Sequence, residues 1–334
     1  MRGPLMGIPV AASSVALLAL LAAAPAQGAV TTARLDAEPR AGVVADGDLW
    51  VLADRGATRV LIETDRVTGR PTGREVVVAT GVPRDLPVLV PMVVRPSIAA
   101  AGGALWTPDP VTGDLVRVDP RTATVTARAP LGAAYVAAGP AGLWITGAPR
   151  PMALPGQEVL PGTVSRVDPA DARVIGRLPT STDSTVEIAV GRRGLWAART
   201  SPTRDLERVD GPVPALIPGG AWQLSARSGT LHATRRYSCT VTILPSEGPG
   251  RSLEMCTRPR ALYPRDVARS GGRVWWAAVA RQGRPRGVVV SRRASGAGGT
   301  SRVAVGDDPV DVVPSGRGVW VLSRSDRTMT RVTP

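Results

Sequence analysis

From about residue 30 to its end, the chain is a succession of short apolar runs, each bounded by glycine, proline or aspartate. Runs of this length that are rich in valine and lie at hairpin spacing predict β-strands joined by tight turns. We find no convincing amphipathic helix in the same region. The pattern of apolar and polar positions therefore predicts an all-β fold.

One phrase, a glycine turn followed by an aliphatic residue and tryptophan, recurs seven times. Its tryptophan position, which we call the Trp slot, recurs at intervals of 36 to 56 residues and is occupied by Trp50, Trp106, Trp144, Trp196, His232, Trp275 and Trp320. Self-similarity at such a period is typical of solenoids and propellers. Each period holds four apolar runs, and four strands form one propeller blade. We therefore predict a seven-bladed β-propeller of four-stranded antiparallel blades.

The two ends of the repeat array complete each other. The last copy stops after its third run, at residues 329–334, while residues 31–36 form an unpaired fourth run ahead of the first copy. Pairing 31–36 with 327–332 would close the ring and remove two exposed sheet edges. The sequence thus predicts that an N-terminal strand completes the last blade.

The N-terminal residues have the pattern of a secretory signal peptide. Arg2 precedes an apolar run over residues 10–24, and small residues follow this run up to residue 28. We expect a signal peptide over 1–28 and a single domain over 29–334, in a secreted or cell-envelope protein. Retention of the segment as a membrane anchor is the alternative.

The formal net charge of +14 comes entirely from arginine, because the chain has no lysine; it also lacks asparagine and phenylalanine. Such a composition is explained by a GC-rich genome, and the arginines are scattered among acidic residues. We therefore expect no nucleic-acid partner. The charge favours a protein or an anionic cell-envelope ligand as partner of a monomeric domain.

The two cysteines, Cys239 and Cys256, fall on the third run and near the fourth run of the fifth repeat. An even count in an exported chain favours a disulfide, and two free thiols are the alternative. The disulfide would strengthen the repeat in which His232 replaces tryptophan. We interpret His232 as a packing residue and the repeat tryptophans as blade core. No histidine then remains for a Ser-His-Asp triad or a histidine-ligated zinc site.

Two insertions interrupt the repeat, at residues 81–96 and 149–162. The first connects a fourth strand to the next first strand, and the second connects a second strand to a third. Both kinds of connection emerge on the same side of a propeller. Because long loops in compact domains usually serve a function, we expect the functional face on this side.

Nine residues before each Trp slot lies the start of an innermost strand, and six of these seven positions are polar: Ala41, Ser97, Tyr135, Glu187, Gln223, Asp266 and Asp311. Innermost strands converge on the ring axis. Glu187, Asp266 and Asp311 could therefore bind a hard cation such as Ca²⁺ or Mg²⁺, or act as acid and base. Alternatively, each accepts backbone N–H bonds in its own turn. Tyr135 and Gln223 would line the same ligand rim.

Arginines follow the second strand in six of the seven repeats: Arg55, Arg150, Arg199, Arg235, Arg281 and Arg324. Guanidinium groups bind carboxylate and phosphate well, so these residues are candidates for an anion-binding rim. Ordinary solvated loop charge is the alternative.

The repeated Gly-Leu-Trp and Arg-Val-Asp-Pro phrases, in four-strand periods, resemble those of the YVTN/NHL-like β-propellers, and within them the virginiamycin B lyase-like group. The resemblance implies the propeller fold over residues 30–334. It also implies a site at the channel mouth, where that group uses a catalytic histidine and a divalent metal to open cyclic depsipeptide antibiotics. None of the seven innermost-strand starts is histidine here.

These observations predict an exported propeller that acts as a ligand-binding, protein-binding or scaffold module, using the face of residues 81–96 and 149–162. The alternative is a metal-dependent lyase or lactonase with Glu187, Asp266 and Asp311 around the ion.

Overall fold

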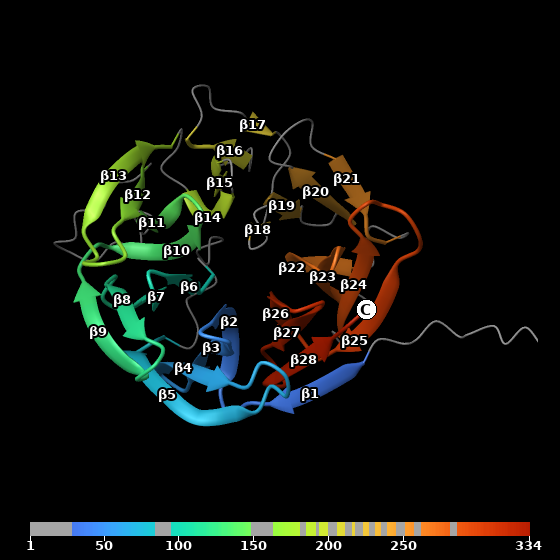
Figure 1. Ribbon diagram of the computed structural model, residues 1–334, viewed down its shortest axis with the longest axis horizontal. Helices are drawn as coiled ribbons and strands as arrows, with labels where there is room; N and C mark the ends of the chain where they lie inside the picture. The colour runs from blue at the N-terminus through green and yellow to red at the C-terminus, as the bar shows by residue number, and fades with distance from the viewer. Residues whose placement is uncertain are drawn as a thin grey trace, which may run out of the picture.

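A computed structural model describes residues 29–83, 95–147, 163–180, 185–191, 194–199, 206–210, 216–217, 223–226, 231–234, 239–244, 251–256, 262–280 and 286–334. These residues form seven four-stranded antiparallel sheets arranged as blades around a central axis (Figure 1). The predicted seven-bladed β-propeller is therefore confirmed. The described residues contain strands and turns only, and none of them belongs to a helix able to cross a membrane. The predicted signal peptide lies outside the described residues.

Each blade is numbered along the chain and runs from its innermost to its outermost strand. Blade 1 contains β2 (Glu38–Ala45), β3 (Asp48–Arg55), β4 (Thr58–Thr64) and β5 (Pro71–Thr80). Blade 2 contains β6 (Ala99–Ala101), β7 (Ala104–Pro108), β8 (Leu115–Asp119) and β9 (Thr124–Ala129). Blade 3 contains β10 (Ala133–Gly139), β11 (Gly142–Gly147), β12 (Thr163–Val167) and β13 (Val174–Pro179).

The remaining blades follow the same order. Blade 4 contains β14 (Thr185–Gly191), β15 (Gly194–Arg199), β16 (Leu206–Arg208) and β17 (Leu216–Ile217). Blade 5 contains β18 (Gln223–Ser225), β19 (Leu231–Thr234), β20 (Thr240–Leu244) and β21 (Arg251–Glu254). Blade 6 contains β22 (Leu262–Ser270), β23 (Arg273–Ala280), β24 (Gly287–Arg293) and β25 (Ser301–Val305). Blade 7 contains β26 (Pro309–Ser315), β27 (Gly318–Ser323), β28 (Thr328–Val332) and β1 (Val30–Arg34).

The ring closes through β1, which pairs with β28 in the register Val30↔Val332 to Arg34↔Thr328. Figure 1 shows the two strands side by side at the outer edge of blade 7. The pairing continues beyond the strands, because the backbone N–H of Leu35 donates to the carbonyl of Arg327 at 2.8 Å. The predicted closure of 31–36 on 327–332 is confirmed.

The hydrophobic core consists of clusters that each join two neighbouring blades. Trp320 of blade 7, for example, packs with Leu49 and Ile62 of blade 1, and Trp106 of blade 2 packs with Leu143 of blade 3. The slot tryptophans Trp50, Trp106, Trp275 and Trp320 are almost fully buried. The interpretation of these side chains as blade core is confirmed, and their large rings account for much of the apolar area buried between sheets.

The blade 5–blade 6 boundary has a compensating tryptophan. In blade 5 the Trp slot holds His232, which is buried. Trp276, next to the slot residue Trp275 on β23, points to the other side of its sheet, as successive strand residues do. It packs against Cys239, Val241 and Leu253 of blade 5. Blade 6 thus supplies the indole that blade 5 lacks.

A disulfide joins Cys239 and Cys256, whose Cα atoms are 5.3 Å apart, as predicted. Cys239 immediately precedes β20 and Cys256 lies just beyond β21, and these strands are paired neighbours. The backbone N–H of Met255 also donates to the carbonyl of Cys239 at 2.7 Å. The bond therefore ties together the two outer strands of blade 5.

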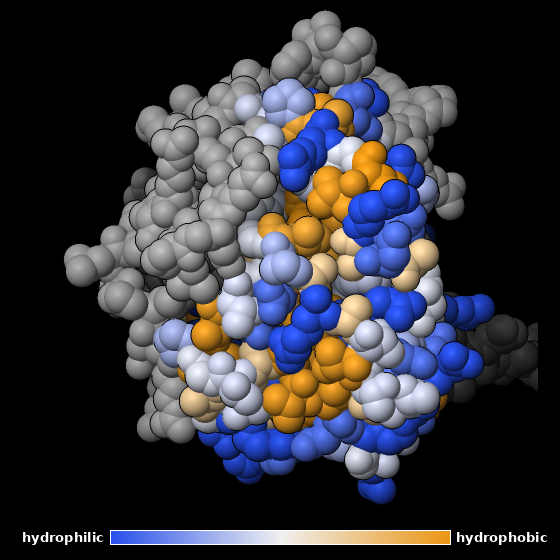
Figure 2. All heavy atoms as spheres, turned by 90° about the vertical axis from the view of Figure 1, so that its left-hand side faces the viewer, coloured by the Kyte–Doolittle hydropathy of each residue, from blue (hydrophilic) through white to orange (hydrophobic). Residues whose placement is uncertain are grey.

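The outermost strands are half exposed. In β9 and β13, exposed and partly buried residues alternate along the strand, as expected for a sheet with one solvent face. Figure 2 shows one side of the molecule, where apolar and strongly hydrophilic side chains are interspersed. Ile175 on β13 is a large apolar side chain that is 47% exposed.

Candidate functional site

The innermost strands carry an irregularity at the point where the sequence predicted site residues. The pairing register with the second strand shifts immediately before Ala41, Tyr135, Glu187, Asp266 and Asp311. Such bulges bend a strand and redirect the side chain that follows. The repeated sequence position is therefore also a repeated geometric position, at the end of each strand away from its hairpin.

Four of these side chains accept a hydrogen bond from the next blade. Asp311 Oδ2 accepts the backbone N–H of Gly42 at 2.7 Å, and Asp266 Oδ2 accepts that of Val312 at 2.8 Å. Ser97 Oγ accepts the N–H of Val136 at 2.9 Å. Glu187 Oε2 accepts the N–H of Leu224 at 3.2 Å. The four acceptors form a series of bonds around the axis that joins neighbouring innermost strands.

These bonds refine one sequence prediction. The carboxylates were expected either to face a ligand or to accept backbone N–H groups of their own turn. The acceptor role is observed, but its main donors belong to the neighbouring blade. Asp311 does both, since its Oδ1 accepts the N–H of the adjacent Val312 at 2.9 Å.

Arg95 occupies the space between the carboxylates. Its Nη1 lies 3.7 Å from Glu187 Oε1 and 3.9 Å from Asp266 Oδ1, and its Nη2 donates to the carbonyl of Val310. Burial alone would lower the pKa of Arg95, but the charges of Glu187, Asp266 and Asp311 raise it above its ordinary value. The guanidinium is therefore a permanent internal counter-ion of the acidic cluster.

Glu187 has a shifted pKa. Burial raises the pKa of Glu187 above its ordinary value, and the charge of Asp311 acts in the same direction. Arg95 and the N–H of Leu224 oppose this shift by stabilising the charged form. The net raised pKa means that the folded protein retains a proton on Glu187 to a higher pH than the unfolded chain.

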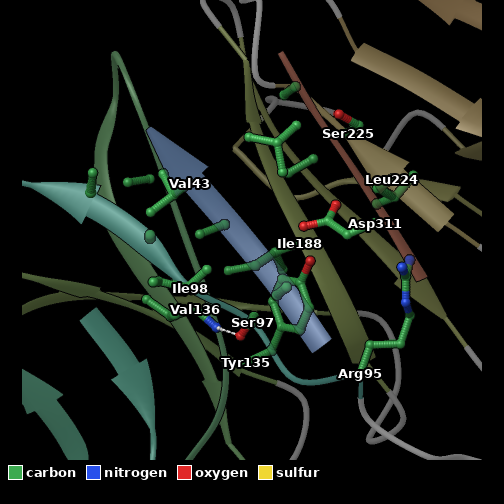
Figure 3. A pocket seen from close by; sticks show the side chains of 18 of the residues that line it. Val43, Arg95, Ser97, Ile98, Tyr135, Val136, Ile188, Leu224, Ser225 and Asp311 are labelled. Atoms are coloured by element: carbon green, nitrogen blue, oxygen red, sulfur yellow. Dashed lines mark hydrogen bonds between the residues drawn. The ribbon is translucent and has the colours of Figure 1, made fainter. Parts of the chain in front are cut away.

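Next to the cluster lies a cavity of about 330 Å³ along the channel. Arg95, Ser97, Tyr135, Asp266 and Asp311 are among its polar lining residues, and most of the remaining lining is apolar, with Arg40 and Ser225 as further polar residues. Figure 3 shows Arg95, Tyr135 and Asp311 projecting into this space from three different segments. The cavity thus combines a charged mouth with apolar walls.

The carboxylate oxygens of this cluster, which could otherwise ligate a metal ion, already have partners within the protein. Glu187 Oε2, Asp266 Oδ2 and both oxygens of Asp311 accept backbone N–H groups, while Glu187 Oε1 and Asp266 Oδ1 face Arg95. Within the described ranges, no group of three or more acidic, histidine or cysteine side chains is arranged to hold a metal ion. The ligation of Ca²⁺ or Mg²⁺ by these residues stays a prediction.

The predicted arginine rim is described only in part. Arg55 Nη2 lies 2.8 Å from Asp36 and 2.9 Å from Glu75, and Arg324 Nη2 lies 2.5 Å from Asp308. Both of these arginines are thus paired with acids of their own chain. Arg150, Arg235, Arg281 and the side chains of Arg199 and Gln223 lie outside the described residues. Anion binding by the rim stays a prediction.

Sequence reasoning missed Arg95 itself. Arg95 stands at the end of the first insertion, 81–96, and no repeat position marks it, because the neighbouring blades have no counterpart. The insertion was nevertheless expected on the functional face, and its last residues do reach the channel mouth. The described ends of the second insertion are the strands β11 and β12, and its own residues lie outside the described ones.

Comparison with known proteins agrees with this geometry at the level of fold. No protein-family model and no curated protein sequence matches the chain. Among solved structures, virginiamycin B lyase from Staphylococcus aureus superposes with a TM-score of 0.62 at 11% identity, over 92% of this chain and 100% of that one. The Cps50 (Swd1) β-propeller domain of Myceliophteria thermophila gives 0.64 at 11%, over 93% and 100%.

A third similar structure is YCF48 bound to D1 peptide, with a TM-score of 0.57 at 12% identity, over 91% of this chain and 95% of that one. The fold is therefore that of a seven-bladed β-propeller, and its structural neighbours include virginiamycin B lyase-like propellers. At such low identity, the likeness extends to the fold alone.

Proposed function

We propose that this protein is an exported binding module whose ligand, a segment of a protein or peptide, enters the channel mouth beside Arg95, Tyr135 and Asp311. The observation that carries the proposal is the cavity of about 330 Å³ at this mouth. Its size is at the lower end of the range for ligand pockets, which are mostly apolar with a few convergent polar groups. A single side chain or chain end of a partner would fill it.

The charges of the mouth favour binding over catalysis. Glu187, Asp266 and Asp311 are engaged by backbone N–H groups and by Arg95, so their oxygens hold neighbouring blades together. A catalytic acid or base needs to reach the reacting atom of a substrate. A ligand that adds hydrogen bonds at the edge of this network would leave it intact.

Two further observations support export and a peptide ligand. A disulfide between Cys239 and Cys256 persists in oxidising compartments, which agrees with the signal-peptide pattern of residues 1–28. One of the similar propellers is described as bound to a peptide. A propeller of this fold is thus a suitable scaffold for a peptide ligand.

The test is selection of peptides from a displayed library on the wild-type protein, followed by calorimetry on two variants. Tyr135→Ala removes a wall of the mouth, and we expect at least a tenfold loss of affinity. Ile175→Ala removes an exposed apolar side chain on the outer strand β13 and should leave affinity unchanged. Failure to select any binder, or equal losses in both variants, would contradict the proposal.

The metal-dependent lyase or lactonase is the competing function, and the same protein tests it. Calorimetric titration of Ca²⁺ and Mg²⁺ into the wild type should give no saturable heat if Arg95 remains the counter-ion. Saturable heat that disappears in Asp311→Ala would favour the enzyme instead.

A further inference from the structure

One position of the repeat is acidic in blades 1 to 4 and basic in blade 6. In blades 1 to 4 the residue opposite the Trp slot on the third strand is Glu63, Arg117, Arg166 or Arg208, and two residues later the chain has Asp65, Asp119, Asp168 or Asp210. In blade 6 the residue opposite Trp275 is Ser291, so the equivalent position is Arg293. Among blades 1 to 4 and blade 6, this position therefore carries a positive charge only in blade 6.

The aspartates at this position have a local structural role. Asp65 Oδ1 accepts the backbone N–H of Thr68 at 2.6 Å, and Asp119 Oδ1 accepts that of Arg121 at 2.8 Å. They stabilise the turn between the third and fourth strands. In blade 6 this turn spans residues 294–300, contains no acidic residue, and has glycines at positive φ, Gly296 at 82° and Gly298 at 77°. Blade 6 thus has neither the acidic side chain nor the kind of turn that it supports in blades 1 and 2.

Arg293 lies directly opposite another arginine. It pairs with Arg273 in the register of β23 and β24, so both side chains lie on the same face of the sheet. Arg273 Nε donates to Ser291 Oγ at 3.1 Å, and its guanidinium lies 6.0 Å from the centre of the Trp275 ring. Like charges opposite each other destabilise a sheet. Burial lowers the pKa of Arg273 below its ordinary value, and the charge of Arg293 lowers it further.

A third arginine comes from blade 7. The hairpin turn of blade 6 packs on that of blade 7, since Ser270 Oγ donates to the carbonyl of Gly316 at 2.8 Å. A Cβ added at Gly271 would overlap the backbone of Arg317, so the two turns are in contact. Arg293 and Arg317 are both exposed. The sheet face of Arg273 and Arg293 is the one that packs on blade 7, because Trp275 contacts Val319 and Val332.

The three arginines lack the acidic partners found elsewhere in the same blades. At the opposite end of blades 6 and 7, Arg265 and Arg324 share Asp308 at 3.1 and 2.5 Å. In the part of the chain that the structure describes, no carboxylate forms an ion pair with Arg273, Arg293 or Arg317. An external anion would relieve the repulsion between Arg273 and Arg293, which lie opposite each other.

We propose that Arg273, Arg293 and Arg317 form an anion site at the hairpin end of blades 6 and 7, which takes a phosphate group. Guanidinium forks match phosphate oxygens in bidentate geometry, and the ring of Trp275 holds one fork in place. The phosphate is either a free anion or part of a phosphodiester such as a lipid headgroup. The site lies at the end of the blades away from the channel mouth and is independent of the function proposed there.

The test uses pyrophosphate as probe, in calorimetry and in thermal unfolding at constant ionic strength set with sodium chloride. Arg293→Asp restores the residue of blades 1 to 4 and should fold normally. We expect saturable binding and a raised melting temperature in the wild type, and at least a tenfold weaker affinity in Arg293→Asp. Arg317→Gln, on an exposed turn, should weaken binding in the same direction.

The matched control is Arg177→Asp on the outer strand β13, which changes the net charge equally at an exposed position of blade 3. It should bind pyrophosphate as the wild type does. Equal affinities of the wild type and Arg293→Asp, equal losses in Arg177→Asp and Arg293→Asp, or no saturable binding to the wild type would each overturn the proposal.

Vesicles distinguish the two sources of phosphate. If the natural ligand is a phosphodiester headgroup, the protein will sediment with phosphatidylglycerol vesicles, and Arg293→Asp will reduce this. If it is a free anion, pyrophosphate will bind while vesicles do not sediment the protein. Vesicle binding that is insensitive to Arg293→Asp, together with unchanged pyrophosphate affinity, counts against the site.

Discussion

The carboxylate of Asp311 in blade 7 accepts the backbone N–H of Gly42 in blade 1 at 2.7 Å, although the two residues are 269 positions apart in the chain. This bond closes the inner circumference of the ring, as the pairing of β1 with β28 closes the outer one. The ring is therefore closed at its outer edge by a strand pairing within blade 7 and at its inner edge by a hydrogen bond between blades 7 and 1.

Replacing Asp311 with alanine should destabilise the protein by about 1–3 kcal/mol, because the buried N–H of Gly42 loses its acceptor. Asp311→Asn keeps an amide oxygen at this position and should cost less. Urea unfolding of the two variants, side by side with the wild type, measures the difference. Equal stability of Asp311→Ala and the wild type would show that the bond does not contribute to closure.

Glu187 should make stability depend on pH. Its pKa is raised in the folded state, so between the ordinary carboxyl pKa and this raised value the native state binds more protons than the unfolded state. Its stabilising contribution is complete below the ordinary pKa and is lost as the pH rises through the folded pKa. The free energy of unfolding of the wild type relative to Glu187→Gln should therefore fall as the pH increases from about 4. A difference that rises or stays flat from pH 4 to 8 would refute the shift.

Gly69 and Gly73 allow a matched test of packing at the ring closure. Both are in blade 1 with positive φ, 72° and 89°. A Cβ at Gly69 would lie 2.5 Å from Trp320 Cη2 of blade 7, whereas one at Gly73 meets nothing within 4 Å. Both alanine variants carry the backbone penalty of about 1–2 kcal/mol. Gly69→Ala should lower the melting temperature well beyond Gly73→Ala; equal shifts would mean that Trp320 moves aside freely.

Loss of the disulfide should destabilise blade 5. The cysteines are separated by 17 positions, and closing a loop of about this size contributes roughly 3 kcal/mol. The double variant Cys239→Ala/Cys256→Ala should melt at a lower temperature than the wild type. Adding a reductant should lower the melting temperature of the wild type and leave that of the double variant unchanged. Identical melting of both proteins without reductant would show that the bond is dispensable.

The repeat made most of the fold predictable. Strand order, the number of blades, the closure by residues 31–36 and the Cys239–Cys256 bond all follow from local signals, namely turn residues, apolar periodicity and position within a period. The positions of Glu187, Asp266 and Asp311 on the innermost strands were predictable for the same reason. Their hydrogen-bond donors were not, since these belong to the following blade.

The sequence by itself determined the unit and how many times it is repeated, because strands and turns depend on residues close together in the chain. Tertiary structure alone decided which side chains meet across blade boundaries. Arg95 reaches Glu187, Trp276 packs against Val241 and Leu253 of blade 5, and Arg317 adjoins the turn that precedes Arg273. These contacts depend on the angle and spacing at which complete sheets pack. That geometry is fixed by the whole ring and is not encoded in any single repeat.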